Sequence, residues 1–174
     1  MATAYIVDAI RTAGGRRGGK LASWHPVDLA AATLDALVAR SGIDGTKVDD
    51  VIMGCVTQAG QQAMQVGRNA VLAAKNLPDS VPAVTIDRQC GSSQQAMQFA
   101  AQAVMSGTMD VVIAAGVESM TRVPMGSNAM FHMKEGLGHY KSQRLDEKYP
   151  GIMFSQFMGA EMIVKKHGFT KDVL

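Results

Sequence analysis

The chain is poor in cysteine, charge and aromatic residues, and these shortages exclude several classes of protein. Two cysteines in 174 residues cannot form a disulfide framework, which favours a reducing compartment. A net charge of +2, with mostly scattered basic residues, provides no nucleic-acid surface. No apolar run approaches the length of roughly 18 residues that spans a bilayer, and the first residues lack a secretory pattern. We therefore expect a soluble cytoplasmic protein that binds neither nucleic acid nor membrane.

Apolar material is abundant instead. Hydrophobic residues make up 47% of the chain and charged residues 18%, with 13 methionines and 18 glycines. This composition is sufficient for a sizeable core. So few charges indicate that much of the surface contacts other protein.

Strand and helix patterns alternate along most of the chain. Such alternation predicts an α/β fold with a mostly parallel sheet and helices on its faces. Turn and capping residues separate the segments, for example Pro26 before a helix and Gly42 after it. The predicted strands are residues 5–10, 48–57, 81–86 and 111–115, and the predicted helices are 26–41, 66–75, 90–105 and 155–166.

Two segments depart from this regular pattern. The predicted helix 90–105 is apolar around its whole circumference, which is typical of a helix covered on several sides. Residues 117–150 form a Met- and Gly-rich stretch that we predict to be irregular. An irregular segment of this length is usually functional or disordered.

Cys90 is the strongest candidate for a catalytic residue. It lies in DRQCGSS, residues 87–93, where an apolar strand turns into a helix. The positive end of a helix and its unpaired N–H groups favour a thiolate, and a thiolate can carry an acyl group as a thioester. Most buried cysteines are inert packing, however. Cys55, inside the apolar run VIMGCV at residues 51–56, fits that second description.

A glycine-rich loop offers a rival function. From Gly14 to Lys20 the sequence reads GGRRGGK, which fits the phosphate-binding pattern GxxxxGK. However, Leu21 stands where a Mg²⁺-binding hydroxyl is needed, and the next helix is delayed to Pro26. A flexible turn with solvated or partner-facing arginines is the alternative interpretation.

The histidines have no metal-binding spacing, so we expect no metal site. There are four of them: His25, His132, His139 and His167.

Several segments in the same order resemble the thiolases, the acetyl-CoA acetyltransferases and 3-ketoacyl-CoA acyltransferases. They are DAIRT at residues 8–12, VIMGCV at 51–56, DRQCGS at 87–92, GTMDVVIAAGVESMT at 107–121 and MGAE at 158–161. The resemblance implies that Cys90 takes the acyl group as a thioester and that its N–H helps to hold an oxyanion. It also implies that Met158 lines the acyl pocket. Coenzyme A would be the co-substrate, with no tightly bound cofactor.

The resemblance also implies an architecture. Residues 1–118 would form the N-terminal thiolase half, with a mostly parallel or mixed five-stranded sheet and helices on both faces. Residues 119–174 would begin the loop domain that covers the substrate. The complete protein would be a homodimer or homotetramer acting in fatty acid metabolism. Phe157 stands where some biosynthetic members carry His, which favours the degradative, β-oxidation branch.

Other parts of the family pattern are absent from the chain. It contains no Gly-His-Pro, Asn-Glu-x-x-Ala or Cys-x-Gly-Gly-Gly motif, which in the family supply the base, a water-orienting Asn and a second cysteine. We therefore expect this chain to be inactive alone and to need a C-terminal half. Three alternatives stay open: an inactive assembly half of a split thiolase, a ketosynthase-like condensing enzyme, and a nucleotide binder at Gly14 to Lys20.

Overall fold

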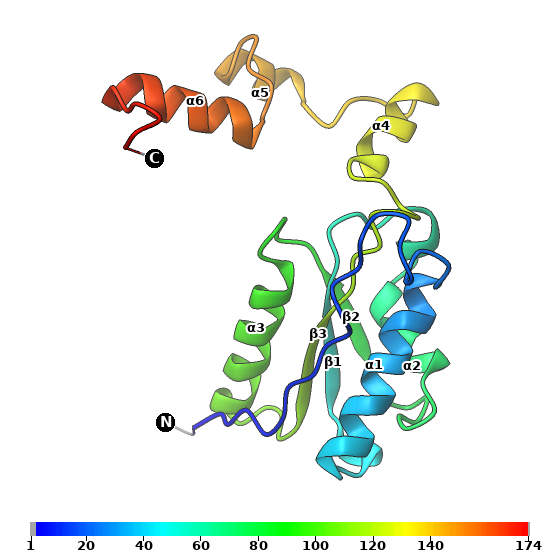
Figure 1. The fold of residues 1–174 in the computed structure, drawn as a ribbon. Coiled ribbons are helices and arrows are strands. Elements are labelled where there is room, and N and C mark those ends of the chain that lie inside the picture. Colours follow the sequence, from blue (N-terminus) through cyan, green and yellow to red (C-terminus); the bar gives the residue numbers. More distant parts are fainter. Residues whose placement is uncertain (1–2, 174) are drawn as a thin grey trace. The chain divides into compact units, whose positions relative to one another are not determined.

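The structure is a computed structural model that describes residues 3–173. Contacts divide it into two compact units, one ending at Glu135 and the other beginning at Gly136. The domain division after residue 118 stays a prediction. Figure 1 labels the elements of both units. In the first unit they are α1 (Pro26–Ser41), β1 (Asp50–Gly54), α2 (Val66–Ala73), β2 (Ala83–Ile86), α3 (Ser92–Ser106), β3 (Val112–Gly116) and α4 (Ser127–Lys134), with short 3₁₀ turns at Gly45–Lys47 and Gly60–Gln62.

The first unit is an α/β fold, as the sequence predicts. Its three strands are parallel and lie in the order β2-β1-β3, so the central strand is the first in sequence. Helix α3 packs on one face of the sheet, and α1 and α2 lie on the other (Figure 1). The side chains of β1 are therefore covered from both sides, and Val51, Ile52 and Met53 are all buried.

The main core lies between the sheet and the pair α1 and α2. Leu34 and Val38 of α1 and Val66 and Val71 of α2 meet Met53 there. A smaller cluster on the other face joins Ile52 to Ala96 and Ala100 of α3. The predicted helix ends are close to the observed ones because local signals set them. Pro26 is the first residue of α1, and its C-cap, Gly42, is left-handed with φ 69°.

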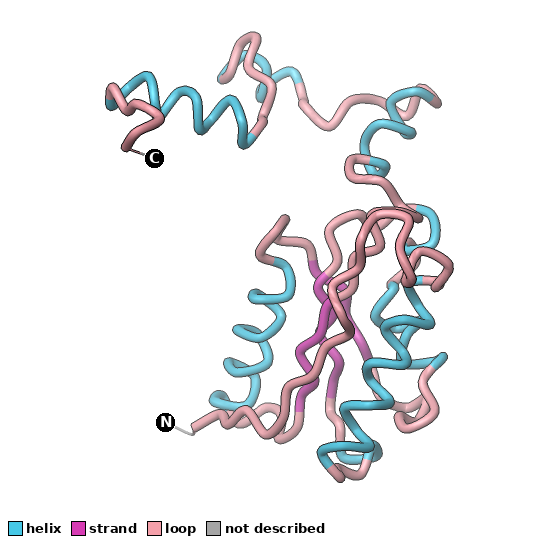
Figure 2. The backbone as a smooth tube through the Cα atoms, in the orientation of Figure 1, coloured by secondary structure: helices cyan, strands magenta, loops and turns pink. Residues whose placement is uncertain are grey.

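The expected first strand is wrong. Residues 5–10 are extended but belong to no ladder (Figure 2), and Tyr5, Ile6 and Val7 are 81%, 74% and 73% exposed. A cavity of about 1420 Å³ is lined by this segment and by β3. Strands must lie roughly 4.8 Å apart to exchange hydrogen bonds, so apolar alternation alone cannot make a strand. The described sheet consequently has three strands rather than five.

One side of α3 is covered and the rest is not. Ala96 and Ala100 are buried against the sheet, whereas Met97, Phe99 and Met105 are 52%, 42% and 43% exposed. Apolar side chains therefore lie away from the sheet side of α3 as well, as the sequence predicts, but the exposed Gln94, Gln98 and Gln102 interrupt them. Within residues 3–173, however, the helix is covered on the sheet side only.

The stretch after β3 is more regular than the sequence predicts. It contains α4 and, in the second unit, α5 (Gln143–Lys148). Their large apolar side chains, such as Met130 and Phe131, are exposed, so no buried stripe marks these helices in the sequence. The predicted helix 155–166 is confirmed as α6 (Gln156–His167), which ends at left-handed Gly168. No residue from 136 to 173 is buried.

Candidate active site at the β2–α3 junction

Cys90 lies in the tight turn that joins β2 to α3, and it is exposed. The preceding residue, Gln89, has a positive φ of 49°, a conformation that L-residues adopt rarely. Gly91 is the N-cap of α3. The chain therefore reverses sharply at Cys90 and presents the thiol at the carboxyl end of the sheet, beside the N-terminus of a helix.

Side-chain hydrogen bonds hold this turn in shape. A carboxylate oxygen of Asp87, Oδ1, accepts the N–H of Gln89 at 2.7 Å. The hydroxyl of Ser92 accepts the N–H of Arg88 at 2.9 Å and donates to the carbonyl of Gln89 at 2.6 Å. Ser92 is itself buried. These bonds stabilise the left-handed residue directly before Cys90, and they come from the residues that flank the cysteine in sequence.

Cys55 lies in a contrasting environment. It follows β1, is 1% exposed, and donates its backbone N–H to the carbonyl of Ile86 at 3.0 Å. Burial, and then the nearby carboxylates of Glu118 and Asp87, raise the pKa of the Cys55 thiol to about 12. A thiol of this kind stays protonated at physiological pH and cannot act as a nucleophile. The difference in burial between the two cysteines agrees with the prediction that Cys55 is a core residue.

A polar network not anticipated from the sequence joins the segment after β3 to the segment after β1. Glu118 accepts the N–H groups of Val56 and Thr57 at 2.7 and 3.2 Å. Gln62, which is fully buried, donates to Thr57 O and Glu118 Oε1 at 2.8 and 3.1 Å and accepts the N–H of Ser119 at 2.6 Å. The network fixes the loops at the carboxyl edge of the sheet. In the sequence, the only sign of this network is that the charged Glu118 directly follows an apolar strand.

The other candidate residues are spread over the molecule. Met158 lies on α6 of the second unit and is 45% exposed. His25 caps α1, accepting the N–H of Val27 at 3.3 Å, while His139 stacks on Tyr140 and His167 on Phe169. Among residues 3–173 no three His, Cys, Asp or Glu side chains gather as metal ligands would. None of the described helices is long and apolar enough to cross a membrane.

The glycine-rich loop lacks the shape of a phosphate-binding loop. Residues 17–23 form turns, and α1 begins only at Pro26. The N–H groups that open α1 therefore lie outside the loop, whereas a phosphate loop leads directly into its helix.

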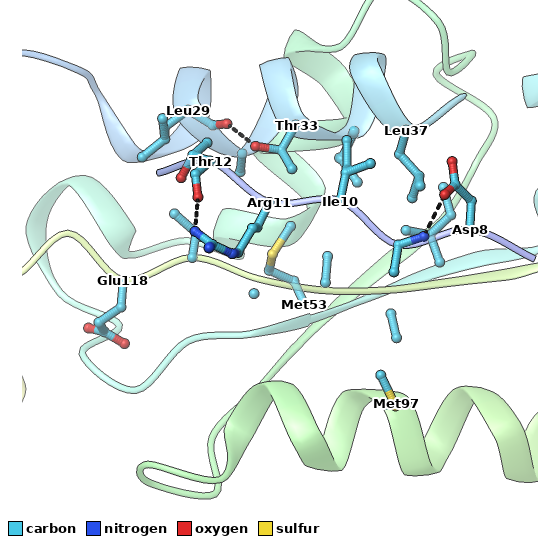
Figure 3. Close-up of a pocket in the computed structure, with 18 of the residues that line it drawn as sticks. Asp8, Ile10, Arg11, Thr12, Leu29, Thr33, Leu37, Met53, Met97 and Glu118 are labelled. Atoms are coloured by element: carbon cyan, nitrogen blue, oxygen red, sulfur yellow. Dashed lines mark hydrogen bonds between the residues drawn. The ribbon is translucent and has the colours of Figure 1, made fainter. Parts of the chain in front are cut away.

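Cys90 is not among the residues that line the large cavity. Figure 3 shows part of its lining: Asp8, Ile10 and Thr12 from the N-terminal segment, with Leu37 of α1 and Met97 of α3. A smaller hollow of about 180 Å³ lies beside the Cys90 turn. It is lined by Arg88, Gly91, Gln94, Gln95 and Gln98.

The fold and the site define an α/β protein that presents an exposed cysteine where a strand turns into a helix. The family description "Thiolase, N-terminal domain" matches residues 4–174, and the chain belongs to the thiolase family. It is 46% identical over 174 residues to the steroid 3-ketoacyl-CoA thiolase FadA6 of Mycobacterium tuberculosis, covering 99% of this chain and 42% of that protein.

Two further relatives agree with this assignment. A 3-ketoacyl-CoA thiolase of Citrobacter koseri is 40% identical over 170 residues, which cover 97% of this chain and 41% of the relative. A beta-ketoadipyl-CoA thiolase of Acinetobacter baylyi is 49% identical over 125 residues, covering 71% of this chain and 31% of the relative. The chain therefore spans less than half the length of each of these curated relatives.

Proposed function

We propose that this chain is the N-terminal part of an acyltransferase that moves an acyl group between coenzyme A and a 3-ketoacyl-CoA, with Cys90 as the nucleophile. The observation that carries the proposal is the exposed thiol of Cys90 at a strand-to-helix turn held by the Asp87 and Ser92 hydrogen bonds. Membership of the thiolase family and the names of the relatives support the reaction class.

The proposed reaction has two steps. The Cys90 thiolate attacks the 3-keto carbon, the bond between C2 and C3 breaks, and acetyl-CoA leaves as an enolate that takes up a proton. The acyl group then remains on Cys90 as a thioester. Free CoA attacks that thioester as a thiolate, and its acyl-CoA product leaves while Cys90 is released. The reverse sequence is a Claisen condensation.

The chain supplies only some of the groups that this chemistry needs. Its own contributions are the nucleophile and, through the turn at Cys90, backbone N–H groups for the thioester oxygen. The proton transfers need separate acid and base groups. We assign these to a C-terminal half, because the sequence contains none of the three family motifs that would supply them.

The remaining parts of the proposal concern substrate and assembly. Met158 would line the acyl pocket from the loop domain. The exposed Met97, Phe99 and Met105 of α3 support burial of this helix against another protein surface. A homodimeric or homotetrameric, cytoplasmic enzyme is the part of the proposal that rests on the family resemblance alone. The relatives at 46% and 40% identity are named a steroid 3-ketoacyl-CoA thiolase and a 3-ketoacyl-CoA thiolase, which supports a 3-ketoacyl-CoA substrate. The preference for the β-oxidation branch rests on Phe157, where some biosynthetic members carry His.

Substitution of each cysteine in the complete enzyme tests the assignment. Cys90→Ser should lower the rate of thiolysis at least roughly 10³-fold, because the intermediate needs the thiol. The matched variant Cys55→Ser should retain activity in the folded fraction and lose stability, because it places a hydroxyl in the core. Thiolysis rates and the mass of acylated protein are the measurements. Equal losses in the two variants would contradict the nucleophilic role of Cys90.

A further inference from the structure

Two glycines lie side by side beneath the helix that follows Cys90. Gly54 ends β1 and Gly116 ends β3, and they are direct partners in the register of the parallel ladder. Neither has a positive φ. The backbone at both positions would therefore tolerate any residue, and a restriction to glycine must come from what lies close by.

What lies close by is the first turn of α3. A Cβ added to Gly54 would lie 2.5 Å from the backbone nitrogen of Ser93 and 2.6 Å from the carbonyl carbon of Ser92. A Cβ added to Gly116 would lie 1.9 Å from the hydroxyl oxygen of Ser93 and 3.0 Å from its Cβ. Carbon atoms in contact normally stay about 3.5–4.0 Å apart. The helix thus rests directly on the backbone of two strands.

We infer that Gly54 and Gly116 are positioning residues that set the location of Cys90. At position 116 the restriction comes from the Cβ of Ser93, 3.0 Å from an added methyl group, because the hydroxyl of Ser93 can rotate away. The inference rests on the proposed role of Cys90 and adds what holds it in place. Cys90 precedes the first residue of α3 by two positions. A methyl group added at Gly54 or Gly116 would therefore push the start of α3, and Cys90 with it, away from the carboxyl edge of the sheet.

The two glycines differ in what they touch. Gly54 faces backbone atoms of Ser92 and Ser93, which cannot be removed by substitution. Gly116 faces chiefly the two side-chain atoms of Ser93, with the carbonyl oxygen of Gly54 farther off at 3.3 Å. Ser93→Gly would delete both side-chain atoms. The steric effect of a methyl group at 116 therefore depends on residue 93, while the effect at 54 does not.

This difference gives a test by second-site substitution. In the complete enzyme, Gly116→Ala should lower kcat about tenfold with little change in KM, since small displacements of a reacting group are costly. In a Ser93→Gly background the same change should lower kcat less than about threefold. Gly54→Ala should lower kcat more than Gly116→Ala does, and Ser93→Gly should not restore it. Gly14→Ala, which has no neighbour within 4 Å of the added atom, is the matched control.

A second measurement separates this inference from the proposed function. The rate at which iodoacetamide modifies Cys90, followed by mass on folded protein, should change in Gly116→Ala and return toward the parent rate in the double variant. This rate requires no acyl transfer, so it stays informative if Cys90→Ser leaves thiolysis intact. The inference is overturned if Gly116→Ala behaves like Gly14→Ala in both measurements. It is also overturned if adding Ser93→Gly to Gly116→Ala restores neither kcat nor the rate of Cys90 modification. A Gly54→Ala variant that does not fold leaves the Gly116 and Ser93 comparison decisive.

Discussion

At the scale of the residue, Asp49 connects the starts of two neighbouring strands. Its Oδ2 accepts the N–H groups of Val111 and Asp110 at 3.0 and 2.7 Å, just before β3 begins. These two bonds, that of Val111 first, hold the pKa of the Asp49 carboxyl below its usual value. A carboxyl group with a lowered pKa in the folded state adds stability above its unfolded pKa, about 3.9, and this contribution is lost as the pH falls through the folded pKa.

We expect Asp49→Asn to show this pH dependence. The amide oxygen can still accept a hydrogen bond but carries no charge. The variant should therefore be less stable than the parent at pH 7, and the difference should shrink as the pH falls below about 4. Urea unfolding at pH 7 and at pH 3 measures both quantities. Asp110→Asn is the matched control, because Asp110 joins this contact through its backbone N–H. An equal effect in Asp110→Asn would contradict the role of the Asp49 carboxylate in the pH dependence.

Individual residues differ in how far the sequence alone could place them. The contrast between Cys90 and Cys55 was predictable, because an apolar run predicts burial while a turn before a helix predicts exposure. The pairing of Gly54 with Gly116 was not, since it depends on the register between strands 62 residues apart in the chain. The same is true of Gln62, whose polar side chain gives no sign in the sequence that it is fully buried.

At the scale of the element, Gln62 links the segments that follow β1 and β3. Gln62→Leu keeps the approximate size of the side chain but leaves the N–H of Ser119 and the carbonyl of Thr57 without their partner. A buried polar group left unpaired costs about 1–3 kcal/mol, and we expect a loss of stability in this range. Urea unfolding measures it. Gln102→Leu, on the exposed part of α3, should change stability by less than about 0.5 kcal/mol. An equal loss of stability in Gln102→Leu would contradict the stabilising role of the Gln62 hydrogen bonds.

Elements with strong local signals were predicted well and those that depend on a partner were not. Helices α1, α2, α3 and α6 were found near their observed ends through capping residues and spacing. Residues 5–10 carry the strand pattern but have no paired neighbour within the described chain. Helix α4 was missed because its apolar side chains face outward, so periodicity and burial do not coincide.

At the scale of the whole molecule, the two compact units differ in how much they bury. Every residue of both hydrophobic clusters belongs to the first unit. No described residue of the second unit is buried. Because burial of apolar surface supplies most of the driving force for folding, the first unit should carry nearly all of the stability of this chain.

A chain truncated after Glu135 tests this expectation. It should unfold cooperatively, at a urea midpoint close to that of the 174-residue chain, when both are followed by circular dichroism. The control is truncation after Gly107, which removes β3 and with it Ile113 from the core, and it should abolish the transition. A shorter chain that ends at Glu135 and shows no cooperative transition would mean that the second unit contributes to the fold.

The sheet edge at β3 has a consequence for handling the chain. Within residues 3–173 β3 pairs with β1 alone, so the backbone on its other side can template a strand from a second molecule. Intermolecular pairing of this kind grows with protein concentration. Self-association is therefore expected when this chain is produced alone at high concentration, and the monomer is best studied in dilute samples.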